Sequence, residues 1–121
     1  MSPSRDTHGV LPSWVVDVLN FWFVELSRQH WFTGGPAIDE QVRTRFLPVH
    51  KFVVAEHEDA LLTNAKTALA AVIVLDQFPR NMFRGTPSAF ASDAKALVLA
   101  ETAISKGFAE ALNDGELLFL Y

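Results

Sequence analysis

An apolar run in the middle of the chain constrains its fold more than any other feature. No polar side chain interrupts residues Ala68 to Leu75, and the polar segment Asp76–Pro87 follows at once. A helix that is apolar on every side has to be surrounded by other elements, so the polar segment attached to it is held against the core. The alanine-rich start and a length of about thirteen residues favour a helix over a buried strand.

Residues at both ends of this central helix mark its expected limits. Thr63 or Asn64 is the predicted cap at its start. Phe78 is the predicted end, because Pro79 biases the residue before it away from helical backbone geometry. The central helix is therefore expected to stop where the polar segment begins.

Apolar residues at helical spacing and capping residues predict the other helices. These helices cover residues 13–26, 36 to about 56–58, 92 to about 106 and 117–121, with one short helical turn after Thr86-Pro87. Ser13 and Ser92 are the expected caps of the first and fourth helices, and Gly107 is the expected left-handed terminator. Asn113 and Glu116 form a capping box before the last helix. Pro48 is expected to kink the second helix or to break it into two pieces.

These elements predict an all-α fold, an antiparallel array of about five main helices with short helical turns. The chain has 121 residues, half of them hydrophobic, which suits one domain with its own core. Residues 1–10 are predicted to be a flexible tail and residues 11–121 a single all-helical domain. Trp31 and Phe32 are expected to pack back on the core, because exposing both rings to water is costly.

Composition argues against several classes of function. The net charge of −4 argues against nucleic-acid binding, which needs a basic face. The longest apolar run is far shorter than the ~20 residues that span a bilayer, and no polybasic run suggests binding to a membrane surface. The chain has no cysteine and no apolar signal segment at its start, which fits a cytoplasmic protein.

The polar segment holds the candidate site residues: Asp76, Gln77, Arg80, Asn81 and Arg84. In the structural interpretation, Asp76 pairs with Arg80 or Arg84, or accepts backbone amides, and fixes the corner between two helices. In the functional interpretation, the two arginines bind a carboxylate or phosphate near the helix starts at Thr86 or Ser92. Asp76 as a general base is a third interpretation, although no histidine or nucleophile adjoins it in sequence.

No metal site or cofactor is predicted. His50 and His57 lie seven residues apart, which is about 10.5 Å along a helix and too far for one metal ion. His30 is expected to be packed or on the surface. The aromatic run Phe21-Trp22-Phe23 has helical spacing and is interpreted as core.

The sequence resembles a bacterial family of unknown function, the one numbered 924. The resemblance covers nearly the whole chain from about Val10. It rests on the segments Val18–Phe23, Trp31-Phe32, Leu75–Pro87, Ala91–Asp93 and Leu118–Tyr121, of which the Asp-Gln-Phe-Pro-Arg-Asn block is the most specific. The resemblance implies a tetratricopeptide-like antiparallel helix array and no particular reaction.

Two departures from the family pattern affect these expectations. The family usually has aspartate where this chain has Asn20, and typical members continue with further helices beyond the position of Tyr121. If the last helix normally packs on those further helices, its apolar face needs another cover. A two-fold homodimer through Leu117 to Tyr121 is therefore predicted.

Two functions are compatible with the sequence. The first is a helical binding or scaffolding module that recognises a protein ligand. The alternative is a small enzyme or a protein that binds a small anion at Asp76, Arg80 and Arg84. The first predicts a groove, and the second predicts that these three side chains converge on one open pocket.

Overall fold

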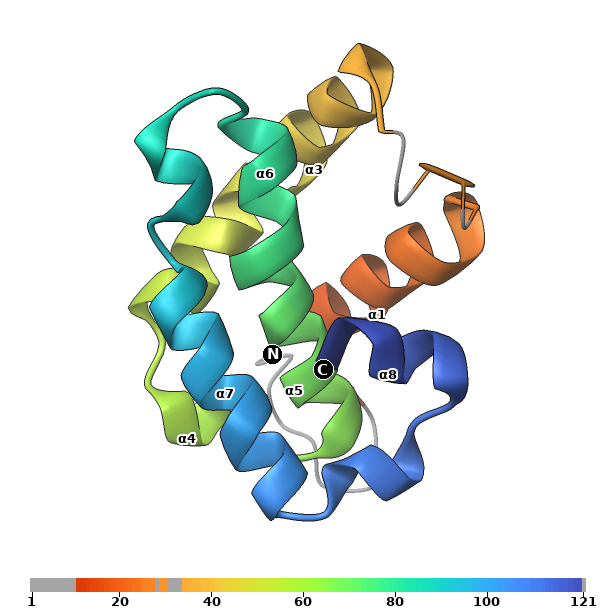
Figure 1. Ribbon diagram of the computed structural model, residues 1–121, viewed down its shortest axis with the longest axis vertical. Coiled ribbons are helices and arrows are strands. Elements are labelled where there is room, and N and C mark those ends of the chain that lie inside the picture. Colours follow the sequence, from red (N-terminus) through yellow and green to blue (C-terminus); the bar gives the residue numbers. More distant parts are fainter. Residues whose placement is uncertain (1–10, 28, 31–33, 121) are drawn as a thin grey trace.

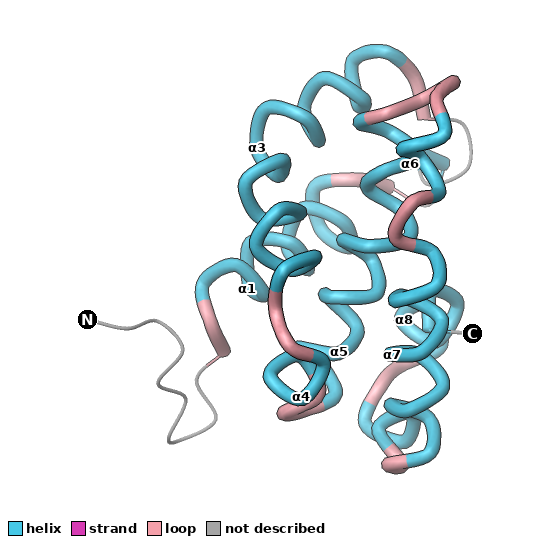
Figure 2. Tube along the Cα trace, turned by 90° about the vertical axis from the view of Figure 1, so that its left-hand side faces the viewer, coloured by secondary structure: helices cyan, strands magenta, loops and turns pink. Residues whose placement is uncertain are grey.

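The protein is all-α, as predicted. The computed structural model describes residues 11–27, 29–30 and 34–120, and within these ranges it contains no strand. Figure 2 shows these residues as helices joined by short loops. Trp31, Phe32, Tyr121 and the predicted tail at residues 1–10 lie outside the described residues. No helix within the described ranges is both long and apolar enough to cross a bilayer.

One long helical rod runs through the centre of the fold (Figure 1). It consists of α5 (Ala65–Val72), a π-helical stretch η2 (Ile73–Gln77) and α6 (Phe78–Met82). Each residue from Ala68 to Leu75 is at most 3% exposed, so the apolar run is buried on all sides as predicted. Asn64 caps the rod, because its side-chain oxygen accepts a hydrogen bond of 2.8 Å from the amide of Thr67.

The prediction that Pro79 ends the central helix is wrong. Phe78 keeps helical angles (φ −61°, ψ −39°), and the helix continues through Pro79 to Met82. A proline cannot donate to the carbonyl four residues earlier, which here belongs to Leu75. The buried hydroxyl of Ser92 donates to that carbonyl instead, at 2.6 Å. A donor from a distant part of the chain thus lets the rod extend into the polar segment.

The other helices surround this rod. They are α1 (Ser13–Asn20) with its π-helical continuation η1 (Phe21–Glu25), α3 (Pro36–Ala55), α4 (Glu58–Leu61), η3 (Pro87–Phe90), α7 (Asp93–Ser105), η4 (Phe108–Ala111) and α8 (Asp114–Leu120). The helices α1, α7 and α8 contact α5, whereas α3 contacts α6 and η2. The core lies along the rod, where Phe78 packs against Phe21, Trp22 and Phe46 with ring centroids 4.9–6.1 Å apart.

Most of the predicted helix ends are confirmed. Asn113 and Glu116 exchange backbone–side-chain hydrogen bonds of 2.8 and 3.0 Å, which is the capping box. Gly107 has φ +82° and ends α7 in the left-handed conformation. Ser13 is the first helical residue and not the cap, since Pro12 precedes it with extended geometry.

Of the two alternatives predicted for Pro48, a kink or a break, the break into two pieces is wrong. The helix α3 is continuous from Pro36 to Ala55 with Pro48 inside it. The proline ring fixes φ near the helical value, so the residue removes one hydrogen bond without forcing the chain out of helical geometry. The turns on both sides of Pro48 are held by buried residues, Val42 and Phe46 before it and Val53 after it.

Lys95 fixes α7 against the end of α3. Its ammonium group donates to the carbonyls of Val53, Val54 and Glu56 at 3.2, 2.9 and 2.6 Å. A cation is favourable there, because the last carbonyls of a helix lack partners within the helix and carry partial negative charge. The inner side of α7 is therefore held in place.

The last helix is largely covered by its own chain. Leu120 is 3% exposed, and the ring of Phe119 lies 5.3 Å from that of Trp22 and 5.8 Å from that of Phe23. Leu118 remains 46% exposed. Among the described residues of α8, Leu118 is therefore the one large apolar side chain that stays exposed.

Candidate functional site

The first half of the polar segment forms an ion-pair network centred on Arg80. Its guanidinium donates to the backbone carbonyl and to Oδ1 of Asp76 at 3.0 and 3.1 Å, and to Oδ2 of Asp93 at 3.4 Å. The same guanidinium lies 4.9 Å from the ring centroid of Phe90, within range of a cation–π contact. Gln77 donates to the other oxygen of Asp76 at 2.8 Å. One cation is thus shared by two carboxylates.

The second half of the segment contacts a different helix. Arg84 donates to both oxygens of Asp39 at 2.7 and 2.9 Å, and Asn81 donates to Oδ1 at 2.9 Å. Asp39 lies in the first turn of α3, and its side chain is only 13% exposed. The hydrogen bond from Arg84 is the main reason that the pKa of Asp39 lies below its ordinary value, and burial opposes it. Asp39 in turn raises the pKa of Arg84.

The five predicted site residues therefore do not converge on one pocket. The pairing of Asp76 with Arg80 is confirmed, whereas the pairing of Asp76 with Arg84 is wrong, because Arg84 binds Asp39. The predicted helix starts at residues 36 and 92 gave the only sequence signal for the missed partners Asp39 and Asp93. Acidic residues are common in the first turn of a helix because of the dipole, so this signal did not identify their arginine partners.

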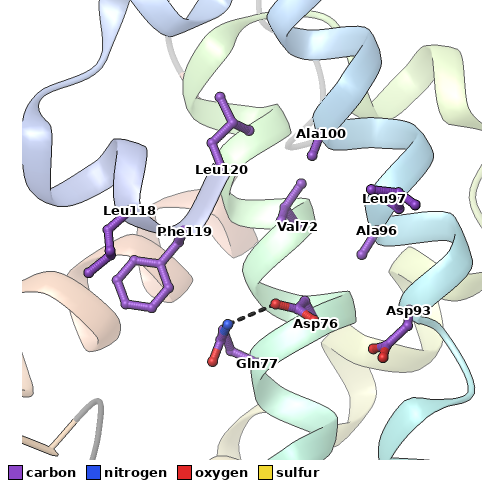
Figure 3. Close-up of a pocket in the computed structure, with 10 residues that line it drawn as sticks. All are labelled: Val72, Asp76, Gln77, Asp93, Ala96, Leu97, Ala100, Leu118, Phe119 and Leu120. Atoms are coloured by element: carbon purple, nitrogen blue, oxygen red, sulfur yellow. Dashed lines mark hydrogen bonds between the residues drawn. The ribbon is translucent and has the colours of Figure 1, made fainter.

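A groove of about 390 Å³ lies beside the Arg80 network, between α7 and α8 and above the central rod. Figure 3 shows Asp76, Gln77 and Asp93 at one end of it and apolar side chains along the rest. Its lining consists of Val72, Asp76, Gln77, Asp93, Ala96, Leu97, Ala100, Leu118, Phe119 and Leu120. We call this feature the α7–α8 groove. Among the predicted site residues, Asp76 and Gln77 line it.

The charged end of the groove has more acceptors than donors. Asp76 and Asp93 bring two negative charges, and the guanidinium of Arg80 neutralises one of them. The Oδ1 atom of Asp93 is buried and has no hydrogen-bond partner within the described part of the chain. The excess of negative charge at this end of the groove favours a ligand group that brings a hydrogen-bond donor or a positive charge.

The apolar part of the groove has exposed edges. Leu97 on α7 is 60% exposed and Leu118 on α8 is 46% exposed, while Ala96 and Ala100 between them are at most 6% exposed. Two large exposed apolar side chains thus stand at the edges of the groove, and the buried lining between them includes Val72 and Leu120 as well as the two alanines. This arrangement is suited to receive an apolar side chain from outside.

The histidines do not form a metal site in the described ranges, where no group of three or more His, Asp or Glu side chains is placed to hold an ion. His30 accepts a hydrogen bond of 3.0 Å from the amide of Ser27. His57 caps α4 by accepting from the amide of Asp59. His50 is half-buried against Phe83, with ring centroids 5.8 Å apart.

Comparison with known proteins assigns the chain to a family. The family model for a bacterial protein of unknown function, DUF924, matches residues 18–121. The chain is also similar to a solved structure, the protein of unknown function ATU0120 from Agrobacterium tumefaciens, with 33% sequence identity and a TM-score of 0.84. The match covers 90% of this chain and 61% of that chain, so this chain spans less than two thirds of its structural neighbour. No protein of curated function matches the sequence.

Proposed function

Because the chain belongs to the bacterial family DUF924, for which no function is established, we propose a function from the geometry alone: a protein-binding module that holds a helical segment of its ligand in the α7–α8 groove. The observation that carries this proposal is the pair of exposed edges, Leu97 and Leu118, on either side of an apolar lining that is buried at Val72, Ala96, Ala100 and Leu120. A groove of this kind suits an amphipathic helix, which places apolar residues in it at intervals of three and four.

The alternative, a small enzyme or a small-anion site at Asp76, Arg80 and Arg84, has less support. Arg80 and Arg84 are each bound to carboxylates of the chain, and they belong to different clusters. An anion at Arg80 would also meet the negative charges of Asp76 and Asp93, which disfavour it. The described site therefore favours a neutral or cationic ligand group.

Three further features belong to the same proposal. The first is that the module is a tetratricopeptide-like array, which agrees with the packing of successive helices around α5. The second is that it lies in the cytoplasm, which agrees with the lack of cysteine. A homodimer through Leu117 to Tyr121 is a second way to cover Leu118, and light scattering at micromolar concentration tests it.

A selection from displayed amphipathic helical peptides tests the binding function. We expect enriched peptides to bind the wild-type protein. Each of Leu97→Asp and Leu118→Asp should raise the dissociation constant about tenfold or more, because burying one leucine contributes roughly 1.5–3 kcal/mol. Val24→Asp is the matched control, since Val24 is 72% exposed and lies outside the groove. The proposal fails if no peptide is enriched, or if the control weakens binding as much as the groove variants do.

A further inference from the structure

We infer that the helical ligand of the α7–α8 groove is cationic: it places a lysine or arginine against Asp76 and Asp93, and its apolar residues lie further along the groove. The inference rests on the proposed function and adds the charge of the ligand. Among the described residues that line the groove, two are carboxylates and none is a cation, since Arg80 is not part of the lining. Charge complementarity therefore selects a positive side chain at this end.

Arg80 is engaged within the chain and neutralises only one of the two carboxylates. Its guanidinium binds the backbone and side chain of Asp76 and the side chain of Asp93, and it lies 4.9 Å from the ring centroid of Phe90. Both carboxylates nevertheless remain partly exposed, so a ligand can reach them. An incoming cation therefore finds one uncompensated negative charge and forms a charge-assisted hydrogen bond without displacing Arg80.

The π-helical stretch η2 presents Asp76 to the groove already held in position. The amide of Phe78 donates to the carbonyl of Ile73, five residues earlier, so this turn contains one residue more than an α-helical turn. Val72, Asp76 and Gln77, which lie at positions i, i+4 and i+5, all line the groove. Gln77 donates to the carboxylate of Asp76 at 2.8 Å. A carboxylate that is fixed before the ligand arrives loses less conformational entropy on binding.

The order of residues along α7 sets the spacing that the ligand needs. Asp93, Ala96, Leu97 and Ala100 are three or four residues apart across successive turns and lie along one side of the groove (Figure 3). From Asp93 to Ala100, α7 advances about 10.5 Å, which is two helical turns. A ligand helix that lies along α7 therefore carries its basic residue at one end of the contact, with apolar residues about four and seven positions away.

The charge preference of displayed helical peptides tests the inference. Each polar position of amphipathic peptides is varied among lysine, arginine, glutamine and glutamate, and the peptides are selected on the wild-type protein. We expect lysine or arginine to be enriched at one position beside the apolar residues. Replacing that basic residue by glutamine should raise the dissociation constant about tenfold. Sodium chloride should weaken binding of the basic peptide more than binding of its glutamine variant, because salt screens exposed charges.

Two variants of α7 separate recognition at the groove from general attraction to an acidic protein. Asp93→Asn and Glu101→Gln each remove one negative charge from a position that is at least partly exposed, but Glu101 is not among the residues that line the groove. We expect Asp93→Asn to raise the dissociation constant of the basic peptide about threefold and to leave that of its glutamine variant unchanged. Glu101→Gln should change neither. Circular dichroism melting establishes that each variant is folded.

The outcomes separate this inference from the proposed function. If peptides are enriched but prefer glutamine or glutamate at every polar position, the inference is overturned and the binding function stands. The same conclusion follows if Glu101→Gln weakens binding as much as Asp93→Asn does. If no peptide is enriched, both are overturned. If the protein instead self-associates through Leu97 and Leu118 and excludes the peptides, a second copy is the occupant and the inference is wrong.

Discussion

Two carboxylate clusters flank the end of the central rod, and they differ in how completely their charges are satisfied. Asp39 is nearly buried and receives three hydrogen bonds from Asn81 and Arg84. Asp76 and Asp93 are 29% and 37% exposed in their side chains and share the single guanidinium of Arg80. The first cluster, which we call closed because its carboxylate is largely covered, joins α3 to the segment after α6, although Arg84 itself is 58% exposed. The second cluster forms the charged end of an open groove.

One continuous polar segment, Asp76–Pro87, therefore contributes side chains to two separate ion-pair clusters. Successive residues of a helix point about 100° apart, while residues three or four apart share a face. Asp76 and Arg80 are four apart in the rod, and Arg80 binds Asp93 at the start of α7. Asn81 lies in the last turn of α6 and Arg84 in the turn that follows it, and both bind Asp39 of α3. These side chains are close in sequence, but they bind different helices and therefore belong to separate clusters.

Removing Asp39 should have the largest effect on stability. Asp39→Ala leaves Arg84 and Asn81 without their acceptor, and we expect it to lower the free energy of unfolding by about 2–3 kcal/mol, as for other hydrogen bonds to a largely buried charge. Asp93→Ala is the matched control in the open cluster and should cost less than about 1 kcal/mol. Urea denaturation measures both. Equal losses would show that the two clusters do not differ as described.

Ser92→Ala should have the next largest effect. Without the hydroxyl, the carbonyl of Leu75 loses the donor that compensates for Pro79, and we expect a loss of about 1–2 kcal/mol. Ser105→Ala, at the exposed end of α7, is the control and should change stability by less than about 0.5 kcal/mol. If the two serine variants are equally stable, the hydroxyl of Ser92 is not needed for the helix to continue through Pro79.

Local rules predicted the parts of this fold that depend on neighbouring residues. The buried run Ala68–Leu75, the cap at Asn64, the capping box at Asn113 and the left-handed Gly107 all follow from side chains within one or two turns. The passage through Pro79 did not follow, because its compensating donor Ser92 is separated from Leu75 by 17 positions.

The candidate site was less predictable for the same reason. Arg84 binds Asp39 across 45 positions, and Arg80 reaches Asp93 across 13. These partners depend on how α3 and α7 pack on the rod, which the pattern of apolar residues does not specify. The groove depends on the same packing, so the sequence showed that Asp76 and Gln77 are candidates without showing that Leu97 and Leu118 lie beside them.

Acid should break the ion pair between Asp39 and Arg84. The pKa of Asp39 in the folded protein lies below its ordinary value of 3.8, so the ion pair contributes fully above that value and is lost as the pH falls through the folded pKa. We expect the stability difference between wild type and Asp39→Asn to be constant from pH 5 to 7 and to shrink below about pH 3.8. Chemical denaturation at each pH measures it. A difference that does not change with pH would mean that the charge of Asp39 is not what stabilises this cluster.

The smallest predicted effect concerns His50, on the same α3 side as the closed cluster. Burial lowers its pKa from 6.5, and its buried Nε2 has no partner among the described residues. Because the unfolded chain then binds a proton more readily than the folded one, His50 reduces stability as the pH falls through about 6.5 and has no such effect at pH 8. His50→Gln should remove that part of the pH dependence. If the wild type and His50→Gln lose stability equally between pH 7.5 and 5.5, His50 is solvated in the folded protein and the α3 side is more open than its packing indicates.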